Sequence, residues 1–293
     1  MSTILVLGDS VIWGQGLAKE HKTAAILARY LGAEMKMLAH SGAKIGVRDS
    51  YSVAMPSGEV PCFFPTILQQ LKGFQDNADS VKWVLLNGGI NDVEVQRIFN
   101  PMVPQYELEL HTRNFCGRDF QILLRQAARR FPRARLLVLG YFPGLSHQSQ
   151  PGGVEAIYSL IHGVQFRPVG DPSLFRHEIV EHCLRFWRLS SGVLRGAVES
   201  VNRENGREHA LFVDSGMHEA HAAYAPQSLL WELNLAGPEM APDEVAEERS
   251  RACDLVGAGP MQQKQCRLSS VGHPNVAGAE LMARQCIRAL AAC

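Results

Sequence analysis

The chain lacks an excess of charge of either sign. Its 29 lysine and arginine residues balance 29 aspartate and glutamate residues, so the formal net charge is zero. Surfaces that bind nucleic acid or anionic membranes are usually strongly basic. Long apolar runs are also missing, since none approaches the ~18 residues that a transmembrane helix needs. We therefore expect neither a nucleic-acid partner nor a membrane span; the composition says nothing about oligomeric state.

Two further absences concern targeting and cofactors. The apolar run Ile4–Leu7 is too short for the hydrophobic region of a signal peptide, so we expect a cytoplasmic protein, with a leader removed before this numbering as the alternative. The segment Gly8–Gly16 lacks the GxGxxG spacing of a dinucleotide-binding loop. No CxxC pair or Cys/His ligand spacing is present. We expect no cofactor and no metal.

The number of cysteines is odd, and they have two interpretations. Buried or free thiols are the ordinary one. The alternative is a Cys253–Cys266 bridge that staples the loop before His273, and it requires an oxidising compartment. The seven residues are Cys62, Cys116, Cys183, Cys253, Cys266, Cys286 and Cys293.

Strand and helix patterns alternate through most of the sequence. Apolar runs typical of strands cover residues 4–7, 35–39, 81–86, 135–140 and 210–214, and helical spacing covers 23–31, 66–71, 119–128, 178–202 and 275–291. Such alternation predicts a parallel sheet with helices on both faces. The sequence contains no linker that divides two domains, so residues 1–293 are expected to form a single domain.

Two segments interrupt this alternation. Proline and glycine punctuate residues 141–176, and residues 220–260 form a second irregular region. Long loops in compact domains are uncommon and usually act as lids or binding loops, so we expect lid-like insertions there, with a plain surface connection as the alternative for 141–176. The acidic run 243–248 is typical of a solvated helix face.

Short motifs follow the first three strand patterns directly. Ser10 comes after the first, a Ser-Gly turn with Gly42 after the second, and Asn91 after the third. Open parallel sheets form their sites at the carboxyl ends of their strands. A hydroxyl, free backbone N–H groups and an amide would meet there, and His273 lies in a turn near the other end of the chain. Nucleophile, donors and base are the groups of an acyl-transfer site.

These blocks resemble those of the SGNH (GDSL-type) hydrolases. Gly8-Asp9-Ser10, Gly42, Gly89-Ile90-Asn91-Asp92 and His273-Pro274 occur in the family's order and span nearly the whole chain. The resemblance implies a flavodoxin-like three-layer α/β/α sandwich with a central parallel sheet and an inserted lid-like region. The nucleophile elbow GxSxG of the α/β-hydrolases is absent, which makes that fold the poorer match.

The resemblance also implies roles for individual residues. Ser10 would be the nucleophile and His273 its general base, while the backbone N–H groups of Ser10 and Gly42 and the Asn91 amide would form an oxyanion hole. The role also explains why position 42 is a glycine: a side chain there would crowd the approaching carbonyl oxygen of the substrate. Asp9 and Asp92 are interpreted as structural carboxylates that hold loop N–H groups.

The chain departs from the family pattern at one position. Where most members carry an aspartate three residues before the histidine, this sequence has Ser270. A backbone carbonyl or the Ser270 hydroxyl would then orient His273 in a Ser–His dyad, which we favour. A distant carboxylate such as Asp214 or Asp254 is the second possibility, and a weak or inactive site is the third.

The function expected from these features is hydrolysis of a small-molecule carboxylic ester by a serine esterase or lipase. A carbohydrate acetyl-esterase of the same fold and a non-catalytic binding protein are the alternatives. Trp13 and Trp231 could stack on sugars or belong to the core. An acyl pocket could be lined by apolar residues of the insertion, namely Phe142, Leu145, Ile157, Tyr158 and Phe166.

Overall fold

The computed structural model describes residues 2–48, 57–236, 243–256 and 259–292. Its centre is a five-stranded parallel sheet in the order β2-β1-β3-β4-β5. The strands are β1 (Thr3–Leu7), β2 (Glu34–Met37), β3 (Val81–Leu86), β4 (Arg135–Leu139) and β5 (Ala210–Val213). The predicted fold class is thereby confirmed, and β1 and β3 are buried between neighbours because their sequences are almost continuously apolar.

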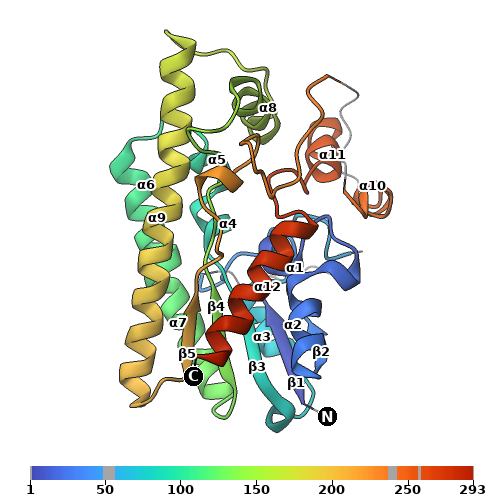
Figure 1. Ribbon diagram of the computed structural model, residues 1–293, viewed down its shortest axis with the longest axis vertical. Helices are drawn as coiled ribbons and strands as arrows, with labels where there is room; N and C mark the ends of the chain where they lie inside the picture. The colour runs from blue at the N-terminus through green and yellow to red at the C-terminus, as the bar shows by residue number, and fades with distance from the viewer. Residues whose placement is uncertain (1, 49–56, 237–242, 257–258, 293) are drawn as a thin grey trace.

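Helices cover both faces of this sheet (Figure 1). On one face α2 (Thr23–Leu31) packs against α12 (Val276–Ala291), and on the other α3 (Ile67–Gly73) and α7 (Phe120–Arg130) pack with α9 (Pro172–Asn205). Shorter helices are α1 (Ser10–Trp13), α4 (Ile90–Val93), α5 (Val95–Ile98) and α6 (Gln105–Thr112), the last joined to α7 through a π-helical segment, η3 (Arg113–Asp119).

The first insertion contains more helix than its sequence suggested. Residues 141–176, expected to be irregular, include α8 (Pro151–His162) and the beginning of α9. Pro151 and Pro172 occupy the first turns of these helices, where proline's missing N–H has no partner to lose. Gly163 ends α8 in the left-handed conformation. The same residues that indicated a loop therefore act as helix boundaries, and α9 begins six residues before its predicted start.

The second insertion also forms helices, and its helical part continues past the predicted end at residue 260 to Arg267. It carries α10 (Ala246–Asp254) and α11 (Pro260–Arg267), which lie with α8 above the carboxyl ends of the strands (Figure 1). Residues 237–242 and 257–258 of the predicted insertion 220–260 lie outside the described residues. Among the residues that are described, no helix combines the length and apolar character needed to span a bilayer.

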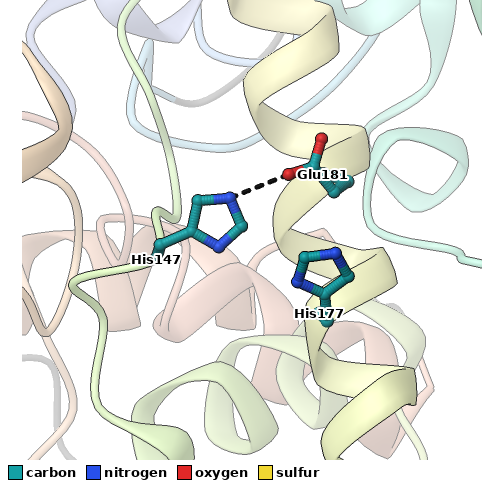
Figure 2. Close-up of side chains that lie close together, drawn as sticks. All are labelled: His147, His177 and Glu181. Atoms are coloured by element: carbon teal, nitrogen blue, oxygen red, sulfur yellow. Dashed lines mark hydrogen bonds and ion pairs between the residues drawn. The ribbon is translucent and has the colours of Figure 1, made fainter.

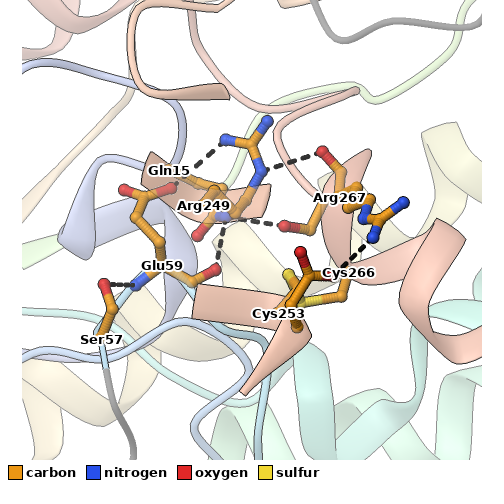
Figure 3. The surroundings of a disulfide bond; sticks show 9 residues. Gln15, Ser57, Glu59, Arg249, Cys253, Cys266 and Arg267 are labelled. Atoms are coloured by element: carbon orange, nitrogen blue, oxygen red, sulfur yellow. Dashed lines mark hydrogen bonds and ion pairs between the residues drawn. A yellow bond between two sulfur atoms is a disulfide. The ribbon is translucent and has the colours of Figure 1, made fainter. Parts of the chain in front are cut away.

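A disulfide joins the two helices of the second insertion. Cys253 of α10 bonds to Cys266 of α11, as the alternative interpretation of the cysteines predicted, and both pack with Val60 and Ala252 in a small buried cluster (Figure 3). Cys116, Cys183 and Cys286 are buried free thiols and Cys62 is a half-buried one. Cys293 lies outside the described residues.

Candidate active site

Ser10 follows the carboxyl end of β1, an interior strand that lies between β2 and β3. It is the first residue of α1 and is 7% exposed. Asp9 caps this short helix by accepting the Val11 N–H at 2.9 Å, which leaves the Ser10 N–H pointing out of the first turn. Within the described part of the chain, the Ser10 N–H donates to no other group. The strand-to-helix turn therefore presents both a hydroxyl and a backbone donor.

Asp9 holds the ends of three strands together rather than acting on a substrate. Its buried carboxylate accepts hydrogen bonds from Asn87 Nδ2 (3.0 Å) after β3 and from the Tyr141 hydroxyl (2.7 Å) after β4. Tyr141 in turn accepts the N–H of Ile90 at 3.1 Å. Burial raises the pKa of Asp9, while its hydrogen bonds lower it. This network sets the positions of Ser10 and α4 relative to one another.

Gly42 and Asn91 approach Ser10 from the neighbouring strand ends. All three line one cavity, and Asn91 Nδ2 donates to the Ala43 carbonyl at 3.0 Å, a contact that uses one of its two amide hydrogens. Asp92 accepts the Ile45 N–H at 3.0 Å and so fixes the glycine turn to α4. These residues therefore meet at the carboxyl ends of the strands, as the sequence predicted.

Besides the expected crowding of a substrate carbonyl oxygen, the structure gives a second reason for glycine at position 42. Gly42 has φ +77°, and a Cβ there would lie 2.5 Å from the backbone nitrogen of Cys62. A side chain is excluded by that backbone contact and by the left-handed conformation, independently of any approaching carbonyl oxygen. Residues 61–62 therefore pass directly beside Gly42, which lines the cavity.

His273 meets Ser10 directly. Its Nε2 lies 2.8 Å from the Ser10 hydroxyl, within the range needed for proton transfer. The histidine sits in a turn whose backbone pairs with Trp231, since the Trp231 N–H donates to the His273 carbonyl and the Gly272 N–H to the Trp231 carbonyl, both at 2.8 Å. The cap of α12 follows immediately, with Asn275 accepting the Gly278 N–H. The imidazole is therefore held from both sides along the chain.

Neither Asp214 nor Asp254 accepts a hydrogen bond from the His273 imidazole, whose Nδ1 has no partner in the described part of the chain. Asp214 accepts the N–H of Gly216 at 2.8 Å, and Asp254 pairs with Arg267 at 2.5 Å on the surface. Both expectations are wrong, because each aspartate already has a local partner. The Ser270 hydroxyl is also engaged elsewhere: it donates to Asp243 Oδ2 at 2.6 Å.

Backbone carbonyls face the imidazole in place of a carboxylate. The carbonyl of Ser270 favours the protonated form most, followed by those of Ser269 and Val271. None is aligned well enough with Nδ1 to form a regular hydrogen bond, and no described side chain partners this atom. Burial dominates and lowers the pKa of His273 to about 4, and the charge of Arg249 lowers it further. The histidine is consequently neutral at physiological pH.

A buried ionic network holds the His273 turn in place, and Figure 3 shows two of its members, Arg249 and Glu59. Arg249 of α10 is fully buried and pairs with Asp243 at 2.9 and 2.5 Å and with Glu59 at 3.4 Å. Glu59 also pairs with Lys22 at 3.5 Å and accepts the Trp13 Nε1–H at 2.6 Å. Through Asp243 the network reaches Ser270 and therefore links α1, α10 and the turn before His273.

Asp243 and Arg249 were missed by sequence reasoning. Asp243 opens an acidic run that predicts a solvated helix face, yet its side chain is fully buried with Arg249. One local signal exists, and it is weak. An aspartate just before a helix often accepts a nearby backbone N–H, and Asp243 accepts that of Val245 at 3.2 Å. Nothing in the run distinguishes this carboxylate from the others, because its burial depends on chain segments far away in sequence.

Substituting Ser270 by aspartate, the residue of the family pattern, should damage this protein. The new carboxylate would replace a hydroxyl that donates to Asp243, and two like charges would then share a buried site. Effective penalties for an uncompensated buried charge are several kcal/mol. We expect a lower urea midpoint and reduced turnover. Ser270→Ala, which keeps the backbone carbonyl, is the control and should lose less; higher turnover in Ser270→Asp would contradict this account.

Above Ser10 and His273 lies a cavity of about 540 Å³. Its walls come from the glycine turn, from α4 and α5, from α8 and α9, and from the disulfide-linked helices. Apolar side chains predominate, among them Ile90, Phe99, Phe142, Ile157, Phe186 and Leu268. Cavities of this size bind small organic molecules and are usually lined this way.

The acyl-pocket residues expected from the first insertion divide into two groups. Phe142 and Ile157 line the cavity. Leu145 is fully buried in the core, whereas Tyr158 and Phe166 pack edge to face on one another at 5.5 Å and are not among its wall residues. Trp13 and Trp231 do not line it either; Trp13 lies under Lys22 at 3.9 Å.

Comparisons with known proteins support the fold. No family model and no curated protein matches the sequence. Among solved structures, phospholipase A1 from Streptomyces albidoflavus NA297 is 14% identical, with 99% of this chain and 98% of that chain covered and a TM-score of 0.54. An extracellular lipase from Streptomyces rimosus is also 14% identical, with coverages of 100% and 99% and a TM-score of 0.50. At this identity the likeness shows a shared architecture over the whole chain.

Proposed function

We propose that this protein is a serine esterase that hydrolyses carboxylic esters with an apolar acyl group. The observation that carries the proposal is the 2.8 Å contact between the Ser10 hydroxyl and His273 Nε2 at the floor of an apolar cavity. A hydroxyl needs such a base because it is barely acidic. The Ser10 and Gly42 N–H groups and the Asn91 amide line the same cavity and supply donors for an oxyanion.

The proposed reaction has two steps. Ser10 attacks the ester carbonyl while His273 Nε2 takes its proton, and the developing oxyanion is held by the three donors. His273 then protonates the leaving alkoxide as the ester C–O bond breaks. Water attacks the acyl-enzyme while the same histidine takes its proton; His273 returns that proton to Ser10 Oγ as the acyl–Ser10 bond breaks and the carboxylic acid leaves. The Ser270 carbonyl favours the imidazolium that forms in each step, so a Ser–His dyad replaces the triad.

Acyl-chain preference tests the proposal against a carbohydrate acetyl-esterase. Burying one methylene gains about 0.8 kcal/mol, which corresponds to about a fourfold rise in kcat/KM per added methylene until the cavity is filled. We expect kcat/KM for p-nitrophenyl esters to increase from acetyl towards medium-length chains. Leu160→Trp, which narrows the cavity, should lower the rate with longer chains and spare acetate, while the exposed Leu174→Trp serves as control.

Two outcomes would count against this assignment. A maximum at acetate with preference for acetylated sugars would favour the acetyl-esterase. Absence of turnover together with failure of a fluorophosphonate to label the wild type would favour a non-catalytic binding protein. If the fluorophosphonate labels the wild type but these esters are not hydrolysed, Ser10 remains the proposed nucleophile and the substrate is a different ester.

The pH profile follows from the state of His273. The base must be neutral, and because burial lowers its pKa to about 4, the neutral form prevails at every pH well above that value. We expect kcat/KM of the free enzyme to be flat from about pH 5.5 to 8 and to fall only towards pH 4. An acid limb near 6.5, the ordinary histidine range, would contradict this. Circular dichroism at each pH separates titration from unfolding.

A further inference from the structure

Three potential metal ligands lie together outside the proposed active site. His147 belongs to the loop after β4, whereas His177 and Glu181 both belong to α9 (Figure 2). One ligand atom from each lies within 4.8 Å of the other two, and the histidines are exposed while Glu181 is half-buried. None of the three lines the cavity above Ser10.

Two of these residues form a natural chelating pair. His177 and Glu181 are four residues apart on one helix, so their side chains lie on the same face. The two imidazoles stack with centroids 5.3 Å apart and ring planes at 28°, and Nε2 of His147 hydrogen-bonds Oε1 of Glu181 at 2.8 Å. Figure 2 shows both rings beside the helix, with the Glu181 carboxylate turned towards His147.

His147 is presented by a well-fixed turn. Ser146 N–H donates to Ser149 Oγ at 3.0 Å, Gln148 N–H donates to Ser146 Oγ at 3.1 Å, and that hydroxyl donates to the Glu219 carbonyl at 2.7 Å. Nearby cations of α9 have other partners, since Arg185 pairs with Glu109 and Arg188 with Glu219. In the described part of the chain, the ion partner of Glu181 is His147 alone.

We propose that His147, His177 and Glu181 bind a divalent metal ion of the zinc type, which clamps the turn before α8 to α9. Two imidazole nitrogens and one carboxylate oxygen are a donor set that zinc favours, with water in the fourth position. Tetrahedral zinc at ~2.05 Å from each ligand needs donor atoms about 3.3 Å apart. The ligand atoms now lie within 4.8 Å of one another, so they must move closer together, and the metal would take the place of the His147–Glu181 hydrogen bond.

The clamp would act on the architecture of the cavity and not on the chemistry. The turn Ser146–Ser149 leads directly into α8, and both α8 and α9 contribute cavity walls. The sequence analysis expected no metal because the ligands follow no Cys/His spacing; only the approach of the β4 loop to α9 brings His147 to the pair.

Zinc binding by the untagged, EDTA-treated and dialysed full chain tests the proposal. Calorimetric titration with ZnCl₂ is expected to show one site in the wild type, and zinc should raise its Tm. His177→Ala and Glu181→Gln should weaken binding by more than the 10- to 100-fold that loss of an outer-shell partner costs, and zinc should no longer raise their Tm.

The matched control is His218→Gln. His218 and His221 also form a close pair of imidazoles, 3.8 Å apart, but belong to no three-ligand group among the described residues. This variant should bind zinc like the wild type. Equal binding by the wild type and Glu181→Gln, or no binding by the wild type, would overturn the proposal. Because the readouts are binding and Tm, the result is independent of ester hydrolysis.

Discussion

Replacing Ser10 by alanine should lower kcat for ester hydrolysis by about 10⁴- to 10⁶-fold, as loss of one member of a catalytic unit does in serine hydrolases. The physical reason is the direct contact between its hydroxyl and His273 Nε2: neither group has its function without the other. His273→Gln should therefore lose about as much, and the double variant should lose little more than either single one.

The measurement is initial-rate hydrolysis of a medium-chain p-nitrophenyl ester, with fluorophosphonate labelling of each variant. Ser10→Ala should not label, and His273→Gln should label slowly. His162→Gln is the control, since this half-buried histidine packs on the Tyr158 ring and contacts the Phe99 carbonyl, and is not a cavity-wall residue; this variant should keep most of the activity. Ser10→Ala activity within tenfold of the wild type would remove Ser10 from the mechanism.

The second large effect is expected at Asp243. Asp243→Asn leaves the fully buried Arg249 with Glu59, at 3.4 Å, as its remaining carboxylate partner among the described residues, besides its hydrogen bond to the Arg267 carbonyl. Breaking a buried ion pair from one side typically costs about 3–5 kcal/mol, and the remaining Glu59 places the expected loss at the lower end, about 3 kcal/mol. Urea unfolding should show it as a lower midpoint with an unchanged slope.

Asp254→Asn is the matched control for this substitution. Asp254 also pairs with an arginine of the same insertion, Arg267, but both side chains are about half exposed. Exposed ion pairs contribute little, so this variant should unfold close to the wild type. If the free energy of unfolding fell equally in the two variants, the buried network would stabilise the fold no more than an exposed ion pair does.

Asp243 is also expected to act as a positioning residue for His273. It holds the Ser270 hydroxyl, and Ser270 presents the carbonyl that faces the imidazole. If Asp243→Asn loosens this turn, water reaches His273 and its pKa rises towards the ordinary value. The acid limb of kcat/KM should then move to higher pH. A variant that is less stable but keeps the wild-type pH profile would limit Asp243 to a structural role.

The sequence predicted the parallel sheet because burial on both faces requires apolar strands, and such runs are visible without any tertiary information. Its errors lie where local signals have two meanings. Pro151 and Pro172 indicate a loop or a helix start equally well, and the acidic run before α10 hides one buried carboxylate among solvated ones. Asp214 and Asp254 were plausible substitutes by charge alone, but each has a local partner.

By itself the sequence determined the fold and the placing of Ser10, Gly42 and Asn91, since groups that follow neighbouring parallel strands must emerge at one edge. Only the tertiary structure decided what surrounds His273. Its turn is held by Asp243 and Arg249, and burial of its imidazole beside backbone carbonyls lowers its pKa. The approach of His147 to α9 was equally invisible. Contacts between segments distant in the chain depend on packing, and no local pattern encodes them.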